Sequence, residues 1–488
     1  MATTKWSRGP ALLIAAGTLG LHAVCATAYG YHRDEFYFLA ESKRLDWAFA
    51  SEPPFTPLLG RLSTTLFGDS LFALRLWPAL AGVAVVLIAT LIARDLGGGG
   101  RAQVIAGLAM GTATVSLSMF HLFGPSAFDQ LAWAGCLWIL LRLVRGADPR
   151  WWLGFGLVAG LGFQNKQTLA LLGLALPVAL LLTPAQRRHA ATPWPWLGAL
   201  LALAIAAPVL VWQAAHDWPM LAVSASIRED EGGLAGAALF LPMQIVTMNP
   251  LLAPVWIAGL WWLFRTVEFR LFGWLYVVLL VLLMVVGGKY YYLTPMYVVL
   301  FAAGGVAAER WSRRRALVPV AVGVAGVVAL PLALPVLPVS AHRDLPITDL
   351  NPVLAETIGW PAFLQQIAAV RDTLPPGERA TAVVLTSNYG QAGAVERLGG
   401  PYGLGQPVSG HNNYWLWGPP ADSAATIIAV GFEDGRGLRA RFGSVTRAGT
   451  VDNGLGVENE EQGTPLWICR DPVQPWSRLW PEFRHYEA

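Results

Sequence analysis

The feature that most constrains the fold of this chain is a series of long apolar blocks separated by short charged loops. Hydrophobic residues make up 55% of the 488 residues and charged residues only 13%, whereas a soluble domain has roughly 25% charged residues. About 20 consecutive apolar residues span a bilayer as a helix. The sequence therefore predicts a polytopic α-helical membrane protein. Eleven spans are expected, at residues 10–29, 71–93, 102–119, 127–144, 151–164, 167–183, 194–213, 240–264, 269–287, 291–308 and 316–338.

Basic residues in every second loop predict the orientation of these spans. Cytoplasmic loops carry an excess of Lys and Arg, so the N-terminus and the basic loops are expected in the cytoplasm. An odd number of spans then places the segment from Ser340 onward outside the cytoplasm, and the chain is expected to be a multi-pass protein of the cell membrane. Ala26-Thr27-Ala28 resembles a signal-peptide cleavage site, but the apolar run before it is longer than a usual signal core, so an uncleaved helix is predicted. The basic loops contain Lys5/Arg8, Arg94/Arg101, Arg142/Arg145/Arg150, Arg187/Arg188, Arg265/Arg270 and Arg310/Arg313/Arg314/Arg315.

Two domains are predicted from the change in composition near residue 340. Residues 1–339 form the transmembrane domain, and residues 340–488 form an extracytoplasmic α/β domain with shorter apolar blocks. Thr381–Thr386 and Thr426–Val430 are expected to be buried strands, and Ala392–Leu398 a helix between them.

The first external loop, residues 30–70, is expected to form two helices lying in the membrane interface. Phe38, Leu45 and Phe49 share one face by helical spacing, which is typical of an interfacial helix. Pro53 and Pro54 end that pattern, and Phe55–Phe67 follows as a second amphipathic segment.

The acidic pair Asp34-Glu35 in this loop is the strongest candidate for chemistry. Ionisable residues beside a bilayer are costly and are functional candidates by default, although ordinary interfacial charges are the alternative. Adjacent residues on a helix point about 100° apart, so the two carboxylates are not expected to act on one bond from opposite sides. One is expected to be catalytic while the other orients it or forms an ion pair.

Other polar residues are expected on the same side of the membrane. Asp129 and His121 lie in the second external loop, where a helix N-terminus also favours a carboxylate and a histidine is more often an interfacial hydrogen-bonding group. The cations Arg75, Lys166 and Lys289 lie at external helix ends, where they could instead extend to the headgroups. Converging cations near a carboxylate suit a phosphate leaving group and a general base.

Composition argues against several other classes. The net charge of +3 comes from basic residues dispersed over many loops and gives no sign of nucleic-acid binding. Cys25, Cys136 and Cys469 are far apart and form neither a disulfide framework nor a metal-binding pattern.

Several motifs in order resemble the bacterial branch of glycosyltransferase family 39, the dolichyl-phosphate-mannose protein mannosyltransferase family, which has the GT-C fold. The resemblance covers nearly the whole chain, and the order and spacing of its motifs are more specific than any single motif. The motifs are Gly30-Tyr-His-Arg-Asp-Glu-Phe-Tyr-Phe-Leu39, Glu52-Pro-Pro-Phe-Thr-Pro-Leu-Leu59, Phe67-Gly-Asp-Ser-Leu-Phe-Ala-Leu-Arg75, Gly162-Phe-Gln-Asn-Lys166, Gly288-Lys-Tyr-Tyr-Tyr-Leu-Thr-Pro295, Asn388-Tyr-Gly-Gln-Ala-Gly393, Gly400-Pro-Tyr-Gly403 and Ser409-Gly-His-Asn-Asn-Tyr-Trp-Leu-Trp-Gly418.

The resemblance implies inverting transfer of a sugar from a polyprenyl-phosphate donor at the external membrane face. It implies that the catalytic position is Asp34 or Glu35, with Asp34 as the base. The chain lacks the large sugar-binding insertion of the eukaryotic members, so the acceptor is left open among a lipid, a cell-envelope glycan and a protein. No cofactor is expected, although a weakly bound divalent cation between Asp34 and Asp129 is an alternative that some GT-C enzymes suggest.

The remaining roles follow from the same hypothesis. Arg75, Lys166 and Lys289 are expected to bind the donor phosphate. Five further residues are expected to contact sugar or acceptor: Asp129, His121, Tyr291, His411 and Asn412. For His411 and Asn412, packing within the external domain is an equally open role.

Two other classes of function remain as alternatives. A transporter or flippase of a polyprenyl-linked or lipid substrate also needs ionisable residues in the membrane, but it is expected to place them near the midplane and to show repeat symmetry. A non-catalytic membrane scaffold whose C-terminal domain binds a partner would not need acid and basic groups clustered on one side.

Overall fold

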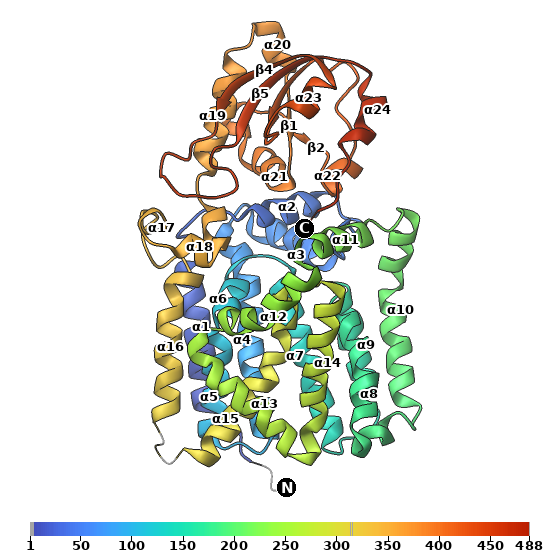
Figure 1. Cartoon of the computed structure of the whole chain (residues 1–488), viewed down its shortest axis with the longest axis vertical. Helices are drawn as coiled ribbons and strands as arrows, with labels where there is room; N and C mark the ends of the chain where they lie inside the picture. The colour runs from blue at the N-terminus through green and yellow to red at the C-terminus, as the bar shows by residue number, and fades with distance from the viewer. Residues whose placement is uncertain (1–3, 313, 315, 488) are drawn as a thin grey trace.

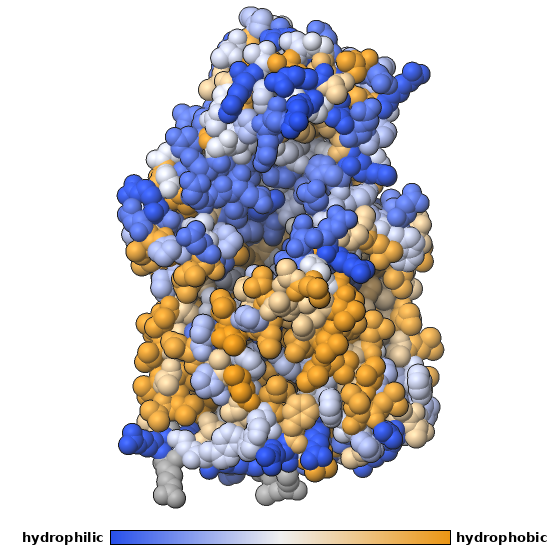
Figure 2. Space-filling model, in the orientation of Figure 1, coloured by the Kyte–Doolittle hydropathy of each residue, from blue (hydrophilic) through white to orange (hydrophobic). Residues whose placement is uncertain are grey.

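Apolar helices form one end of the molecule, and a mixed α/β layer covers the other end (Figure 1). The computed structural model describes residues 4–312, 314 and 316–487. Figure 2 shows a broad apolar belt around the helices, a hydrophilic surface over the α/β layer and a thin hydrophilic rim at the opposite end. This distribution is that of a multi-pass membrane protein with a polar domain on one side.

Six helical segments of the described chain are long and apolar enough to cross a membrane, or up to eight if each bent helix pair is one span. Every predicted span overlaps one of these segments or one of three shorter apolar helices, and the number of crossings stays a prediction. The long segments are α1 (Arg8–Cys25), α4 (Leu71–Asp95), α7 (Pro125–Val144), α10 (Trp194–Ala215), α14 (Arg270–Val286) extended by the 3₁₀ turn that starts at Val267, and α15 (Tyr297–Trp311) extended by the 3₁₀ turn that starts at Tyr290; the shorter helices are α8 (Trp151–Phe163), α9 (Leu169–Leu182) and α16 (Leu317–Ala333).

Two spans are bent rather than straight. Helices α5 (Gly100–Thr112) and α6 (Thr114–His121) meet at 62°, and α12 (Gly233–Thr247) and α13 (Ala253–Arg265) meet at 84°. The second bend has a local cause, because Asn249 has a φ of 75° and the next residue is a proline, which donates no backbone hydrogen bond. The Asn249 amide donates to the Ala325 carbonyl at 2.8 Å and so fixes the break against α16.

Three helices lie across the end of the bundle under the α/β layer: α2 (Arg33–Lys43), α3 (Phe55–Phe67) and α11 (Pro219–Glu231) (Figure 1). Helix α3 agrees with the predicted second amphipathic segment. The first prediction was wrong in extent, because α2 ends at Lys43. Leu45 therefore lies beyond the helix and is exposed, while Phe49 is buried in the loop that follows.

The C-terminal domain contains a five-stranded sheet in the order β2-β1-β3-β5-β4. Strand β1 pairs in parallel with β2 and β3, and β5 pairs antiparallel with β3 and β4. The predicted strands correspond to β1 and β3 and the predicted helix to α21, while three strands were missed. The strands are β1 (Val383–Thr386), β2 (Val408–Ser409), β3 (Thr426–Val430), β4 (Phe442–Thr450) and β5 (Pro465–Pro472), and the main helices are α19 (Trp360–Asp372) and α21 (Tyr389–Leu398).

The C-terminal domain is joined to the membrane domain mainly through α21 and α2. Phe36 of α2 is part of the hydrophobic core formed by α19, α21 and the sheet. At the far end of the contact, Glu396 pairs with Lys43 at 3.1 Å and with Arg44 at 3.0 Å. The predicted domain boundary at residues 339/340 falls between α16 and α17 (Ala341–Asp344), and the boundary itself stays a prediction.

The predicted external groups lie together. The lysines after α8 and α14, the acidic pair of α2 and the first residues of α21 all lie at the end of the bundle that the α/β domain covers, and the N-terminus lies at the opposite end (Figure 1). Two arginines of the predicted basic loops, Arg313 and Arg315, lie outside the described residues.

Candidate active site

Two cavities adjoin at the N-terminal end of α2, between the helix bundle and the α/β domain. The lysine cavity, lined by Lys166 and Lys289, has a volume of about 340 Å³. The methionine cavity, lined by Met119 and Met243, has a volume of about 360 Å³. Figure 2 shows the hollow in the surface between the apolar belt and the α/β domain. The residues that line both cavities are Asp34, Phe38, Pro125, Lys166 and Tyr291.

Asp34 is the carboxylate that both cavities share. It is the second residue of α2, and its side chain is 42% exposed. Its Oδ1 accepts a hydrogen bond of 2.9 Å from the Tyr389 hydroxyl of the α/β domain. Partial burial favours the neutral acid, but the neighbouring His32 and Arg33 and the bond from Tyr389 outweigh it and hold the pKa of Asp34 below its ordinary value. Asp34 is therefore an ionised carboxylate that can accept a proton within the site.

The start of α2 explains why Asp34 points into the cavities. His32 is the N-cap residue, and its Nδ1 accepts from the Asp34 backbone N–H at 3.2 Å. Glu35 completes a capping box by accepting from the His32 backbone N–H at 2.8 Å. The cap turns Glu35 back toward the helix start and leaves the side chain of Asp34 free to face the opening.

Lys166 and Lys289 bring positive charge to the lysine cavity. The Lys166 ammonium lies 5.0 Å from the Tyr292 ring centre and 3.3 Å from the Ser126 hydroxyl. Burial lowers the pKa of Lys166, and the nearby charge of Lys289 acts in the same direction. Within the described part of the chain the Lys289 ammonium has no ion pair. Two cations that repel each other and lack a full set of acceptors form a favourable site for an anion.

A second pair of acids lies at the wall of the lysine cavity. Glu52 lines the cavity and accepts from the Ser51 hydroxyl at 2.8 Å, while its other oxygen is buried without a partner among the described residues. Glu41 is fully buried and accepts from the Asn413 amide at 2.5 Å. Burial raises the pKa of Glu41 and of Glu52, and in Glu41 the neighbouring Glu52 adds to this effect. Both carboxyls are therefore easier to protonate than exposed ones, and Glu52 can exchange hydrogen bonds with a ligand in the cavity.

Glu35 and Arg75 lie outside both cavities, in a closed polar centre on the other side of α2. The Glu35 carboxylate accepts from Arg75 at 2.9 and 2.7 Å and from the Phe123 backbone N–H at 2.9 Å. Arg75 also donates to the carbonyls of Ala26 and Gly30. Every donor nitrogen of Arg75 is thus in use, and the structure does not bring this side chain to a position where it could bind a donor phosphate.

His121 belongs to the same closed centre. It is 1% exposed, lies 3.5 Å from Arg75 and stacks on the ring of His22. It lines neither cavity. The structure therefore does not place His121 where it could contact a sugar or an acceptor directly.

Asp129 lies directly behind the lysine cavity. It is 5% exposed and its Oδ1 accepts from the Thr168 hydroxyl at 2.6 Å, while Thr168 itself lines the cavity. Of the two acids offered as ligands of a weakly bound divalent cation, only Asp34 lines a cavity, and this alternative stays untested. Among residues 4–312, 314 and 316–487 no group of three or more His, Cys, Asp or Glu side chains is arranged to hold a metal ion.

The remaining predicted residues differ in position. Tyr291 lines both cavities beneath Lys166, at 5.4 Å from the ammonium. Asn412 lines the lysine cavity, but its side-chain amide donates a hydrogen bond to the backbone carbonyl of Glu487 at 2.8 Å. His411 lines neither cavity and stacks between Tyr389 and His485 at 4.7 Å from each ring. Burial lowers the pKa of His411 to about 3, so this ring is neutral.

Three residues of the site were not predicted from the sequence. Tyr389, Glu52 and Glu487 all line the lysine cavity. Tyr389 and Glu52 belong to motifs that carried the family resemblance, so their motifs were a signal, but nothing in the spacing gave either a role. Glu487 has no such signal, because only the folding of the C-terminal segment against Asn412 brings it to the cavity.

Comparison with known proteins confirms the fold. The family model described as dolichyl-phosphate-mannose-protein mannosyltransferase matches residues 51–212. The structure is similar to ArnT from Cupriavidus metallidurans bound to undecaprenyl phosphate, with 17% identity, a TM-score of 0.61 and coverage of 95% of this chain and 98% of that one. The apo state of the same ArnT gives 18% identity and the same TM-score, 0.61, over the same shares of both chains.

A second similar structure is the arabinofuranosyltransferase AftD from Mycobacteria, at 14% identity and a TM-score of 0.52, with 97% of this chain and 40% of that chain covered. No curated protein matches the chain in sequence. The family model confirms the resemblance over residues 51–212, and the solved structures confirm the fold. The chain has the GT-C fold of membrane glycosyltransferases, and residues 51–212 are similar to the dolichyl-phosphate-mannose-protein mannosyltransferases.

Proposed function

We propose that this chain is an inverting glycosyltransferase that moves a sugar from a polyprenyl-phosphate donor to an acceptor at the external membrane face. The observation that carries the proposal is that one ionised carboxylate, Asp34, lies where the two cavities meet, and that Lys166 and Lys289 line the same lysine cavity. The GT-C fold supports it, and the similar ArnT is described as bound to undecaprenyl phosphate.

The chemistry follows from what each group can do. Asp34 accepts the proton of an acceptor hydroxyl or amine, and the freed lone pair attacks the anomeric carbon. The bond between that carbon and the phosphate oxygen breaks in the same step, so the configuration inverts. The phosphate leaves as polyprenyl phosphate, and Lys166 and Lys289 stabilise the negative charge that develops on it. Glu35 takes no part, because its carboxylate is held by Arg75.

The two cavities suit two substrates. In this proposal the donor phosphate binds in the lysine cavity, next to the two lysines. The first isoprene units of its lipid contact the apolar wall of that cavity, which Leu171, Ile227 and Leu283 form in part. The acceptor enters the methionine cavity, whose wall is mostly apolar but also carries the Asp34 carboxylate, the Lys166 ammonium and several hydroxyl groups. Asp34 lines both cavities, as a base between donor and acceptor must.

The orientation is part of the same proposal. The basic loops lie at the end of the bundle opposite the α/β domain, which supports a cytoplasmic N-terminus and an extracytoplasmic site by the excess of Lys and Arg on the cytoplasmic side. The partners are then a polyprenyl-phosphate-linked sugar, the lipid bilayer and an acceptor of the cell envelope, and no metal or organic cofactor enters the scheme.

A direct assay separates this function from transport. The purified protein is incubated with a panel of radiolabelled polyprenyl-phosphate sugars, with and without an extract of envelope lipids and glycans. We expect consumption of one donor, release of polyprenyl phosphate and labelled product with inverted configuration. In sealed liposomes a flippase would instead move the intact donor between leaflets, and that result without transfer or donor hydrolysis would overturn the proposal.

A further inference from the structure

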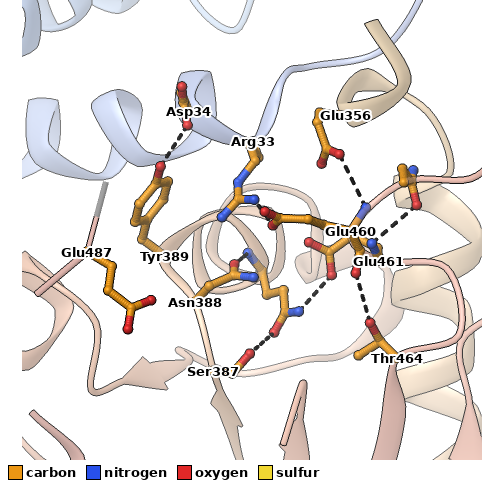
Figure 3. A network of polar contacts seen from close by, with 12 residues as sticks. Arg33, Asp34, Glu356, Ser387, Asn388, Tyr389, Glu460, Glu461, Thr464 and Glu487 are labelled. Carbon is orange, nitrogen blue, oxygen red and sulfur yellow. Dashed lines mark hydrogen bonds and ion pairs between the residues drawn. The ribbon is translucent and has the colours of Figure 1, made fainter. Parts of the chain in front are cut away.

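Among the described residues of the α/β domain, Tyr389 is the one whose side chain forms a hydrogen bond with the proposed base. It is the first residue of α21, and its hydroxyl donates to Asp34 Oδ1 at 2.9 Å (Figure 3). The two residues are 355 positions apart in the sequence. The orientation of Asp34 therefore depends on a part of the chain that is distant in sequence.

The ring of Tyr389 is held from three sides. It stacks on Tyr37 of α2 with the ring centres 4.4 Å apart and the planes at 28°. On another side it contacts His411 at 4.7 Å, and the guanidinium of Arg33 lies 5.2 Å from its centre. A ring packed in this way has few rotamers, so its hydroxyl stays directed at Asp34.

Arg33 is in turn fixed by acids of the α/β domain. It forms an ion pair with Glu460, and Figure 3 shows Glu356 and Glu461 on the same side of the guanidinium. The charge of Arg33 favours ionisation of Glu356 and Glu461, and they favour the charged form of Arg33. These contacts keep the Arg33 side chain over the tyrosine ring.

Two glycines allow α21 to approach α2 closely enough for this bond. A Cβ at Gly393 would lie 2.6 Å from the Cβ of Phe36 and 3.0 Å from its backbone carbonyl carbon. A Cβ at Gly390 would lie 2.8 Å from the Cβ of Arg33. Glycine is required here because real side chains do not pack at these distances, and larger residues would move Tyr389 away from Asp34.

Groups from several elements surround Asp34. The cations and the bond from Tyr389 favour its carboxylate, while nearby acids and the burial of the site oppose ionisation. Removing the Tyr389 hydroxyl alone therefore raises the pKa of Asp34 and leaves the other charges unchanged. The charged and titratable groups that face Asp34 are His32, Arg33, Lys166, Lys289, Glu52, Glu356, Tyr291 and Tyr389.

Resting on the function proposed above, we propose that Tyr389 is a positioning residue that holds Asp34 in its proton-accepting orientation and so makes sugar transfer depend on the docked α/β domain.

The test compares Tyr389→Phe with Tyr414→Phe in the full-length protein. Phenylalanine at 389 keeps the stacked ring and removes only the donor to Asp34. Tyr414 is a matched control, because it is a buried tyrosine of the same interface whose hydroxyl donates to a carboxylate away from the cavities, Glu396, at 3.0 Å. Both variants are assayed for transfer against pH, for donor KM and for thermal stability.

We expect Tyr389→Phe to lower kcat at neutral pH by about 10- to 100-fold, the effect of a misplaced catalytic group, with donor KM unchanged. We also expect the acidic limb of its kcat/KM profile to move to higher pH by about one unit. The loss of kcat at neutral pH should remain, because Asp34 is ionised there in both proteins. Tyr414→Phe should keep the kcat and the pH profile of the unsubstituted protein.

Two results contradict the inference, and they differ from failure of the function itself. If Tyr389→Phe loses thermal stability but its folded fraction has normal kcat and an unshifted acidic limb, Tyr389 has only a structural role. If Tyr414→Phe shifts the limb equally, the effect belongs to the interface and not to the bond with Asp34. If the unsubstituted chain transfers no sugar from any donor, the proposed function fails and this inference fails with it.

Discussion

Asp34 and Glu35 are adjacent in the chain and belong to two different polar centres. Glu35 is fully buried and accepts two hydrogen bonds from Arg75 and two from backbone N–H groups, all at 2.9 Å or less. Asp34 is 42% exposed, accepts one hydrogen bond from a side chain and lines both cavities. A carboxylate whose acceptor sites are filled stabilises the fold, and one whose sites are open can exchange a proton. The same difference separates Arg75 from Lys166 and Lys289.

The largest expected effect is on stability, at the closed centre. Arg75→Met should lower the free energy of unfolding by about 3–5 kcal/mol, because it leaves the buried charge of Glu35 without a partner. Thermal unfolding of the purified protein measures this. Arg397→Met is the control, since Arg397 pairs with Asp69, whose side chain is 80% exposed, and such a pair is worth about 0–1 kcal/mol. An Arg75 variant with normal stability and weak donor binding would show that Arg75 binds the phosphate after all.

The next effect concerns the donor, at the open centre. Lys166→Met and Lys289→Met should each weaken donor binding by about 1–3 kcal/mol, or about 5- to 150-fold, because each loses a charge-assisted contact to phosphate. Donor titration checks the prediction. Lys43→Met serves as a control, because Lys43 pairs with Glu396 and lines neither cavity. Unchanged donor affinity in both cavity variants would show that the donor phosphate does not bind next to these lysines.

A smaller effect is expected from an acid that is buried but lies outside both cavities. Burial raises the pKa of Glu461 to about 7, so the folded chain binds a proton that the unfolded chain has lost. This stabilisation is fully present below the pKa of the carboxyl in the unfolded chain, about 4.3, and is lost as the pH rises through about 7. Over that range the free energy of unfolding falls by at most about 1.4 kcal/mol per pH unit. Thermal unfolding between pH 5 and 8 should therefore show a slope that Glu461→Gln reduces. An identical slope in the variant would contradict the assignment.

The smallest expected effect is on the donor. Asn412→Ala should change the donor KM by about fivefold, the worth of a hydrogen bond of about 1 kcal/mol, because it releases the segment at Glu487 from the lysine cavity. Acceptor KM should stay the same, because Asn412 does not line the methionine cavity. Asn459→Ala is the control, because its amide donates to Ala355 and Ile358 away from the cavities. Equal KM values in the Asn412 and Asn459 variants would show that Asn412 has no role in substrate binding.

The sequence was most informative where a local pattern determines the structure. Apolar blocks located the spans, and the amphipathic segment Phe55–Phe67 matched α3 to the residue. The end of α2 was missed because Lys43 and Arg44 pair with Glu396, a residue more than 350 positions away. Strands β4 and β5 were missed because their residues alternate poorly between apolar and polar, and pairing across the sheet defines them.

The site was only partly predicted, because some of its features depend on contacts between residues that are distant in sequence. The sequence placed Asp34, Lys166, Lys289 and Tyr291 on one side of the membrane, and all four line the lysine cavity. It could not separate Arg75 from the lysines, because all three are basic residues at helix ends. Only the folded structure shows that Glu35 turns away from Asp34 and occupies Arg75.

The most direct test of the two-centre account measures turnover and stability together in Asp34→Asn and Glu35→Gln. We predict that Asp34→Asn keeps the thermal stability of the unsubstituted protein and loses about 10²- to 10⁴-fold in sugar transfer, as expected for loss of a general base. We predict that Glu35→Gln loses stability on the scale of Arg75→Met, while the protein that remains folded transfers sugar at a nearly normal rate. Near-normal transfer by Asp34→Asn, or loss of transfer in a fully stable Glu35→Gln, would contradict the account.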